Sequence, residues 1–308
     1  MASFTIGVDV GGTNIKYGLV DAEGRIIARE SFKTALFSNK HKLIKGLIDH
    51  ILQSLHKYNI LKKQVLGIGI GFPGLIDFPQ GIVKTVTNLK GWNNVPLKKA
   101  METQLGLPVF LDNDVNVIAL GEWKYGAGKG YENIICITLG TGVGGGLILN
   151  NQLYRGKGFS AGEVGHIMIN EKGPVCNCGG KGCLEAYVGN KVLLKNARKI
   201  FKNKEIAIED IGVLAKKGTP AAIQFWQDTA THIGNALIGI VNLLNPELII
   251  IGGGISNNYS FLGKTIMQII KKNAMKVPAR LVKVVRAKLG DDAGIIGAKV
   301  LVKEAIHV

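Results

Sequence analysis

The sequence predicts an α/β protein built from two similar halves. Hydrophobic runs of strand length alternate along the chain with segments whose apolar residues recur at helical spacing, which is typical of an α/β fold. In addition, the pattern of strand, glycine-rich turn and strand at residues 4–20 recurs at residues 134–149. This recurrence indicates an internal duplication.

The predicted elements of the first half follow in order. The opening pattern has strands on either side of Gly11-Gly12, and a turn at residues 21–24 leads into a third strand at residues 25–29. Apolar residues between positions 43 and 55 have helical spacing, and residues 65–71 are typical of a buried strand. The first half therefore begins as a meander of three strands and continues as alternating helix and strand.

The second half repeats this plan. A turn at Asn150-Asn151 extends the second pattern into a short strand at residues 152–154. Residues 229–246 carry no formal charge, but the polar residues and proline among them favour a buried helix over a membrane span. A strand at residues 248–251 runs into a third glycine loop, and helical spacing returns at residues 294–305.

Composition narrows the function classes. The chain has 38 basic and 22 acidic side chains, a formal charge of +16, but its lysines are scattered in short groups. No zinc-finger spacing, RNP-like aromatic motif or basic heptad segment directs this charge onto a groove, so we expect no specific nucleic-acid partner. No secretory signal is predicted, and three of the four cysteines are clustered. These features favour a cytoplasmic protein, away from the membrane, with metal or redox chemistry rather than disulfides.

The two glycine-rich turns between strands are candidate phosphate sites. Such turns expose rows of backbone N–H groups, and two of them can hold one polyphosphate. At the first turn Asp9 is placed to hold Mg²⁺, directly or through water, while Thr13 and Lys16 can reach phosphate oxygens. Taken alone, either turn is a weak signal that favours an ordinary β-turn. Because strands follow both turns, neither fits the phosphate loop or the dinucleotide fingerprint, and a Rossmann oxidoreductase is disfavoured.

Polar residues follow the short apolar strand that is predicted near residue 110. Asp112, Asn113 and Asp114 fall at its C-terminal end, where open α/β sheets hold ligands. A carboxylate there can orient a hydroxyl group and accept its proton. The alternative is that Asp112 or Asp114 caps the helix expected to begin near Val115.

Three cysteines and a histidine form a candidate metal site. Cys176, Cys178 and Cys183 follow His166 within a short stretch, and three thiols with one imidazole are a donor set that tetrahedral Zn²⁺ prefers. The alternative, buried apolar cysteines, is disfavoured because these lie among glycines and polar residues. Four protein ligands would make the zinc structural. Cys136, within a strand, is expected in the core.

Two carboxylates lie at the ends of this cysteine-rich loop. A zinc ion would fix Glu163 and Glu185, and each carboxylate can accept hydrogen bonds from adjacent hydroxyl groups. Paired carboxylates of this kind suit the recognition of a polyhydroxyl compound. The alternative is that both are ordinary surface charges.

Six segments together carry a resemblance to a known family. They are Asp9-Val-Gly-Gly-Thr-Asn14, Gly71-Phe-Pro-Gly74, Asp112-Asn-Asp-Val-Asn116, Leu139-Gly-Thr-Gly-Val-Gly-Gly-Gly146, Glu163-Val-Gly-His166 and Cys176-x-Cys178-Gly-x-x-Gly-Cys183-x-Glu185. In this order they look like the ROK family of sugar kinases and repressors. The resemblance runs from about residue 4 to about residue 300, and the cysteine motif with Glu-x-Gly-His is very specific.

The resemblance implies the actin-like ATPase (ribonuclease H-like) fold, with two duplicated α/β lobes around a cleft. In that family the C-terminal helix usually returns to the first lobe. Residues 1–118 with about 294–308 would then form a small lobe, and residues 119–293 a large lobe with the zinc-binding loop. Similar proteins are commonly dimers, so a homodimer or higher homo-oligomer is expected.

The resemblance also implies roles for individual residues. Asp114 resembles the general base, and His166 would use one ring nitrogen for zinc and the other for sugar. The residues implied to contact sugar are Gly74, Asn113, Asp114, Glu163, His166 and Glu185. Those implied to bind Mg²⁺-ATP are Asp9, Gly11, Gly12, Thr13, Asn14, Lys16, Gly140, Thr141, Gly142, Gly144, Gly145, Gly253 and Gly254. The implied zinc ligands are His166, Cys176, Cys178 and Cys183.

The activity that the resemblance implies is ATP-dependent phosphorylation of the 6-hydroxyl of a hexose. Glucose is the expected substrate, while N-acetylmannosamine, N-acetylglucosamine, mannose, fructose and allose stay open, as does polyphosphate as donor. A sugar-responsive repressor is the alternative from another class. Repressors of the family carry a helix-turn-helix before the first phosphate motif, and only eight residues precede Asp9, which disfavours that reading.

Overall fold

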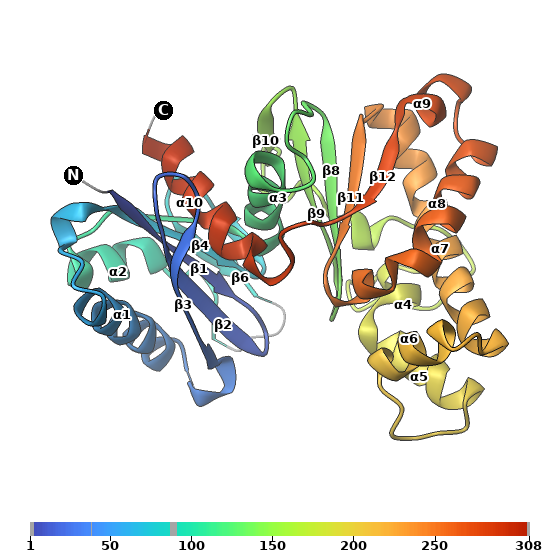
Figure 1. Cartoon of the computed structure of the whole chain (residues 1–308), viewed down its shortest axis with the longest axis horizontal. Helices are drawn as coiled ribbons and strands as arrows, with labels where there is room; N and C mark the ends of the chain where they lie inside the picture. The colour runs from blue at the N-terminus through green and yellow to red at the C-terminus, as the bar shows by residue number, and fades with distance from the viewer. Residues whose placement is uncertain (1–2, 38, 87–90, 307–308) are drawn as a thin grey trace. The chain divides into compact units, whose positions relative to one another are not determined.

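The computed structural model describes residues 3–37, 39–86 and 91–306. Its contacts divide the chain into two compact units (Figure 1). Unit 1 comprises Met1–Gly130, Leu153–Ala161 and Asp291–Val308, and unit 2 comprises Tyr131–Gln152 and Gly162–Gly290. Unit 1 thus extends beyond residue 118, the limit expected from the sequence, and takes in a short segment from the middle of the chain.

Unit 1 is built on a five-stranded sheet in the order β3-β2-β1-β4-β7. The strands are β1 (Phe4–Val10), β2 (Asn14–Val20), β3 (Ile26–Lys33), β4 (Val65–Phe72) and β7 (Val109–Asn113), with a small separate sheet of β5 (Leu75–Asp77) and β6 (Ile82–Thr85). β2 is antiparallel to β1 and β3, whereas β4 is parallel to β1 and β7. The predicted opening meander is therefore confirmed.

Four α-helices accompany the sheet in the described residues of unit 1. They are α1 (Lys40–Lys57), α2 (Leu97–Leu105), α3 (Asp114–Tyr125) and α10 (Ala293–Ile306). The apolar positions that predicted α1, from Leu43 to Leu55, are buried. Figure 1 shows α1 and α2 on one side of the sheet and α10 on the other. Every residue from Ala293 to Val302 is buried, so the C-terminal helix is part of the core of this unit.

Unit 2 repeats the same sheet plan in the order β10-β9-β8-β11-β12. β8 and β9 are antiparallel, and β11 is parallel to β8 and β12, as in unit 1. The strands are β8 (Ile134–Leu139), β9 (Val143–Leu149), β10 (Gln152–Tyr154), β11 (Leu248–Gly252) and β12 (Lys283–Arg286). This matching order confirms the duplication that the sequence predicted.

Six helices belong to unit 2. They are α4 (Glu185–Val188), α5 (Asn190–Ile200), α6 (Ile208–Lys216), α7 (Pro220–Leu244), α8 (Tyr259–Asn273) and α9 (Lys276–Leu281). The long uncharged segment forms the C-terminal part of α7, which ends where Asn245 adopts a left-handed conformation with φ 44°. Over the described ranges of the chain, no helix combines the length and apolar character that a bilayer crossing requires.

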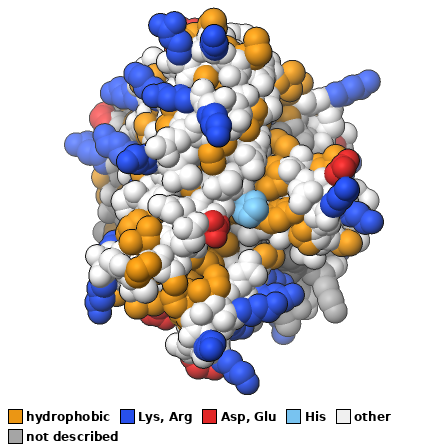
Figure 2. All heavy atoms as spheres, turned by 90° about the vertical axis from the view of Figure 1, so that its right-hand side faces the viewer, with side chains coloured by type: hydrophobic (Ala, Val, Ile, Leu, Met, Phe, Trp, Pro, Cys, Tyr) orange, Lys and Arg blue, Asp and Glu red, His pale blue; other side chains and the backbone are white. Residues whose placement is uncertain are grey.

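Basic side chains are distributed over the surface. On the face drawn in Figure 2, Lys and Arg side chains stand at several separate places rather than in one continuous patch. This distribution agrees with the expectation of solvated basic surfaces. A dispersed charge raises solubility but does not outline a groove for a nucleic-acid backbone.

Candidate functional site

The first glycine turn, between β1 and β2, is held by its own backbone and by Thr34. The Gly11 N–H donates to the Asn14 carbonyl at 3.0 Å. Thr34 is buried; its hydroxyl donates to the Gly11 carbonyl at 2.8 Å, and its N–H donates to the Thr13 carbonyl at 3.0 Å. The turn that contains Gly11, Gly12 and Thr13 is therefore fixed through its carbonyl groups. Sequence reasoning missed Thr34, because nothing in the local pattern links it to the turn.

Asp9 lies before this turn and against the start of α10. A Cβ atom added to Gly294 would lie 2.5 Å from Asp9 Cγ, so only glycine lets the helix begin this close to the carboxylate. Burial raises the pKa of Asp9 from 3.8 to about 6, although Lys16 opposes the rise. Lys16 Nζ pairs with Asp291 Oδ1 at 2.8 Å. A partly desolvated carboxylate beside a lysine and a glycine turn is suited to a metal-bound polyphosphate.

The polar residues after β7 form the first turn of α3. Asn113 is the N-cap, and its Oδ1 accepts from the N–H groups of Val115 at 2.9 Å and Asn116 at 3.3 Å. The alternative that Asp112 or Asp114 caps this helix is therefore wrong. An amide caps as well as a carboxylate does, and the helix begins one residue earlier than expected, at Asp114. The Asn113 Nδ2 donates to the Gly74 carbonyl at 3.1 Å, which links the two residues predicted to contact sugar.

Asp112 is buried, and both of its carboxylate oxygens accept hydrogen bonds from neighbouring residues. Its Oδ1 accepts from the Asn113 N–H at 2.7 Å and from Asn116 Nδ2 at 2.9 Å. Its Oδ2 accepts from Arg155 Nε at 2.6 Å, and the Arg155 guanidinium carbon lies 3.9 Å from the centroid of the Phe78 ring. Sequence reasoning missed Arg155, which lies far from Asp112 in the chain.

Asp114 is the first residue of α3 and keeps part of its side chain open to solvent. Its Oδ1 accepts from the Val115 N–H at 3.0 Å. Burial raises the pKa of Asp114 from 3.8 to about 6, and repulsion from Asp9 adds to the rise. The carboxylate is therefore ionised near neutral pH but is a stronger proton acceptor than an ordinary aspartate.

The second glycine turn, between β8 and β9, is held by residues that follow the cysteine motif. The Gly140 N–H donates to the Gly142 carbonyl at 3.0 Å, and the Asn190 N–H donates to the Gly140 carbonyl at 2.9 Å. On the other side of the turn, Glu185 Oε2 accepts from the Val143 N–H at 2.9 Å. One carboxylate oxygen of Glu185 is thus used inside the protein, which sequence reasoning did not anticipate.

The third glycine loop lies against the end of β8. Gly253 has φ 78°, and a Cβ atom there would lie 2.3 Å from the Leu139 carbonyl oxygen. Gly254 borders a pocket of about 280 Å³ in unit 2. Its other lining residues include Asn190, Arg198 and Glu209, and the Asn190 Oδ1 is buried without a hydrogen-bond partner. The pocket therefore offers both hydrogen-bond donors and hydrogen-bond acceptors beside the second glycine turn.

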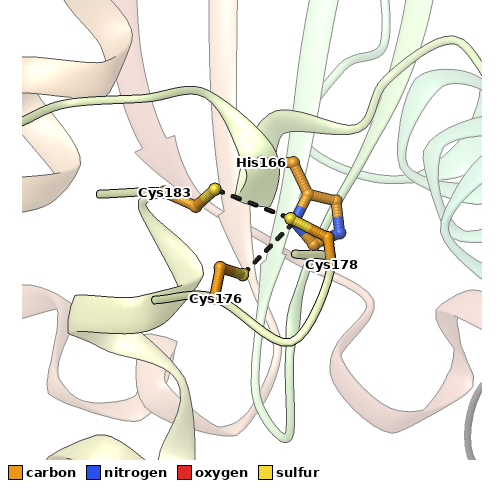
Figure 3. A group of neighbouring side chains, drawn as sticks. All are labelled: His166, Cys176, Cys178 and Cys183. Atoms are coloured by element: carbon orange, nitrogen blue, oxygen red, sulfur yellow. Dashed lines mark hydrogen bonds between the residues drawn. The ribbon is translucent and has the colours of Figure 1, made fainter. Parts of the chain in front are cut away.

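The four residues grouped as zinc ligands lie together in unit 2 (Figure 3). The ligand atoms of His166, Cys176, Cys178 and Cys183 are all within 4.8 Å of one another. Cys176 Sγ lies 3.7 Å from His166 Nδ1, and Cys178 Sγ lies 3.7 Å from Cys183 Sγ. Figure 3 shows the side chains converging from a cysteine loop and from the segment that carries His166. Cys136 is fully buried in β8, as expected.

The electrostatics of this cluster fit a metal. Burial raises the pKa of the Cys183 thiol to about 12, whereas the backbone N–H of Gly180 lowers the pKa of the Cys178 thiol. A cation that binds thiolates favours deprotonation of all three thiols. Three sulfur atoms and one imidazole nitrogen at these separations can converge on a tetrahedral ion such as Zn²⁺.

The second ring nitrogen of His166 faces Glu163. His166 Nε2 lies 3.8 Å from Glu163 Oε2, and the Glu163 side chain is 63% exposed. A Cβ atom on Gly165 would lie 2.3 Å from the Val143 carbonyl oxygen, so this glycine lets the segment pack directly on β9. The packing of this segment on β9 thus positions His166 beside the cysteines, with its Nε2 turned toward the exposed Glu163 carboxylate.

Comparisons with known proteins agree with this arrangement. The sequence model of the ROK family matches residues 5–305. A glucokinase from Thermotoga maritima is 33% identical over 98% of this chain and 98% of its own length. The crystal structure of a ROK family glucokinase from Streptomyces griseus, in complex with glucose and AMPPNP, matches with a TM-score of 0.82 and 33% identity over 98% of this chain and 100% of that one. A xylose repressor from Caldicellulosiruptor bescii is 34% identical over 96% of this chain and 77% of its own length.

Proposed function

Because the chain belongs to the ROK family, we propose that the protein is an ATP-dependent glucose kinase that phosphorylates the 6-hydroxyl group. Its fold is the actin-like ATPase fold of that family, with the same sheet order in both units. The observation that carries the proposal is Asp114, a carboxylate at the start of α3 whose pKa is raised to about 6. We choose glucose over the other hexoses because glucokinases are among the relatives of this chain.

Asp114 is proposed as the general base. The oxygen of the sugar hydroxyl forms the new bond to the γ-phosphorus of ATP, the bond from that phosphorus to the β,γ-bridging oxygen breaks, and ADP leaves. The hydroxyl proton passes to Asp114. A sugar hydroxyl is a far weaker acid than this carboxyl group, so the proton moves as the new bond forms and not before. Most of the rate enhancement then comes from positioning and charge neutralisation.

The glycine turns are proposed to hold ATP. The first turn, with Gly11, Gly12, Thr13 and Asn14, and the second turn, with Gly140, Thr141, Gly142, Gly144 and Gly145, would bind phosphate oxygens through backbone N–H groups. Lys16 would add positive charge, and Asp9 would hold Mg²⁺ directly or through water. Gly253 and Gly254 would face the adenosine. The pocket beside Gly254 supports this assignment, since it offers polar groups for a base.

The sugar is proposed to bind through groups that each unit presents. Unit 2 offers the exposed Glu163 carboxylate, His166 Nε2 and the second carboxylate oxygen of Glu185. Unit 1 offers Asn113 and Asp114, with Gly74 fixing the Asn113 amide. Carboxylates and an imidazole each bind pairs of hydroxyl groups well, which suits a hexose. The metal held by His166, Cys176, Cys178 and Cys183 is proposed to be Zn²⁺ with a structural role.

Two further assignments are proposed from the sequence. The enzyme is proposed to act in the cytoplasm, which its few, clustered cysteines favour over an oxidising compartment. It also assembles as a homodimer or higher homo-oligomer. Exposed apolar side chains at the end of α7 and in α9 support self-association: Leu243, Met275, Val277 and Leu281 are 59–82% exposed. Light scattering coupled to gel filtration measures the mass directly.

The test of the proposal is release of ADP from Mg²⁺-ATP with glucose and a panel of other hexoses and N-acetylhexosamines, for the wild type and Asp114→Asn. Strong turnover on glucose that the substitution abolishes is the expected result. Turnover on another sugar would replace glucose as substrate, and an equally active variant would refute the base assignment. No turnover on any sugar, together with sequence-specific DNA binding that a sugar releases, would favour the repressor class instead.

A further inference from the structure

We propose that Arg155 is a positioning residue for the base Asp114, an inference that rests on the proposed function. The ion pair between Arg155 and Asp112 would hold the first turn of α3 in the geometry that phosphoryl transfer needs. Arg155 lies outside all the sequence motifs that predicted site residues. The structure alone places it beside this turn.

The contacts form a continuous path from Arg155 to the base. Arg155 Nε donates to Asp112 Oδ2 at 2.6 Å, and the other Asp112 oxygen accepts from the Asn113 N–H and from Asn116 Nδ2. Asn113 in turn caps the helix through the Val115 and Asn116 N–H groups. Asp112 therefore accepts hydrogen bonds from Asn113 and Asn116, the residues on either side of Asp114 and Val115.

Burial makes Asp112 dependent on its partner. The Asp112 side chain is 3% exposed, and a carboxylate removed from water in this way is stable only if it is paired and hydrogen-bonded. Arg155 supplies the pairing charge. Without it, the Asp112 carboxylate would need water or a cation in place of the guanidinium, and either change would alter the hydrogen bonds that hold Asn113 and Asn116.

Arg155 is itself held in place, so that it can act as a fixed point. Its guanidinium lies over the Phe78 ring, and its carbonyl oxygen accepts from the Ala161 N–H at 3.1 Å, which closes the loop of residues 155–161. An arginine that is stacked and paired loses little further freedom when the site operates. Because the Nε edge is paired with Asp112 and one face is stacked on Phe78, a role as a direct phosphate ligand is disfavoured.

The position of Arg155 in the chain adds a connection to the sugar. Glu163 follows Arg155 by eight positions, and the intervening loop ends where Glu163 leads into the turn of His166. The same short segment thus carries the residue that fixes the base and the residues proposed to bind hydroxyl groups.

The experiment compares kcat and KM for Arg155→Ala with the wild type. We expect kcat to fall by about 100-fold, the order of loss caused by a misplaced reacting group, with both KM values changing little. Millimolar guanidinium chloride should restore at least about tenfold of the lost kcat, because it refills the site of the missing charge. Arg25→Ala is the matched control. It removes another Arg–Asp pair of unit 1, Arg25 Nε to Asp21 Oδ2 at 2.7 Å, at a turn that packs on the C-terminal end of α3 and not on its first turn, and should leave kcat unchanged.

A folded Arg155→Ala protein with wild-type kcat, or a loss that guanidinium does not restore, would overturn the inference. If Arg155→Ala fails to fold, the variants Asp112→Asn, Arg155→Gln and their combination form a double-mutant cycle. If Arg155 acts through Asp112, the second substitution adds little to the loss in kcat caused by the first. Losses that multiply would refute the path. Asp114→Asn distinguishes failure of the proposed function from failure of this inference. If Asp114→Asn is inactive while the Arg155 variants are fully active, only the positioning role of Arg155 is refuted.

Discussion

Replacing Asp114 by Asn should abolish turnover and, at the same time, stabilise the nucleotide-free protein at neutral pH. Burial is the main cause of the rise in the pKa of Asp114 from 3.8 to about 6. A difference of one pKa unit corresponds to about 1.4 kcal/mol, so the ionised carboxylate lowers the free energy of unfolding by at most about 3 kcal/mol. Asn keeps the oxygen that accepts from the Val115 N–H but carries no charge, so it removes this penalty.

The sign of the pH dependence follows from the direction of the shift. The folded-state pKa lies above the unfolded-state pKa, so between about pH 4 and about pH 6 the folded protein binds more protons at Asp114 than the unfolded chain does. The contribution of this group is therefore favourable below about pH 4 and is lost as the pH rises through about 6. The advantage of Asp114→Asn over the wild type should be full at about pH 8 and shrink as the pH falls toward 4.

Urea unfolding of both proteins, without nucleotide or Mg²⁺, at about pH 8 and about pH 5 measures this difference. Asp112→Asn is the control with the opposite expected effect, because it leaves the half-buried Arg155 without its charged partner and should destabilise the protein. The reasoning fails if Asp114→Asn is no more stable than the wild type at pH 8. It fails equally if the advantage does not shrink at pH 5.

The other predictions concern unit 2. Cys178→Ala should lose the bound metal in elemental analysis, whereas Cys136→Ala, in the core of β8, should keep it; equal metal content in both would contradict the proposed ligand set. Glu185→Ala should raise KM for ATP as well as for sugar, because the carboxylate holds the second glycine turn, while Glu185→Gln should mainly raise KM for sugar. Steady-state kinetics separate the two effects, and an unchanged KM for ATP in Glu185→Ala would show that the turn does not depend on this bond.

Much of the fold follows from short-range patterns. The alternation of apolar runs and the two glycine turns predicted both sheets, since strand length, period and turn chemistry are local properties of the chain. The assignment of Leu153–Ala161 to unit 1 was not predictable in this way. This segment carries Arg155, which pairs with Asp112 and stacks over Phe78, and neither contact has a counterpart in the local sequence.

The candidate site also contains features that local sequence predicts and features that depend on distant residues. The metal cluster was accessible from sequence because three of its ligands lie close together in the chain and because thiols among glycines have few other uses. The support given by Thr34 to the first turn and by Glu185 to the second was not accessible. In the sequence, a threonine or glutamate that faces water cannot be distinguished from one whose side chain hydrogen-bonds to the backbone of a distant turn.

Glu185 shows why a residue in such a site tolerates little change. It follows Cys183 by two positions, so the metal loop determines where its carboxylate lies, and one of its oxygens already accepts from the Val143 N–H. Only the other oxygen is left for a sugar hydroxyl. In the proposed site the same carboxylate holds the phosphate turn and binds a sugar hydroxyl. If sugar binding shifts this carboxylate and so changes the affinity for ATP by some factor, then bound ATP must change the affinity for sugar by the same factor. On this proposal, the binding of glucose and the binding of ATP would be coupled through the Glu185 carboxylate.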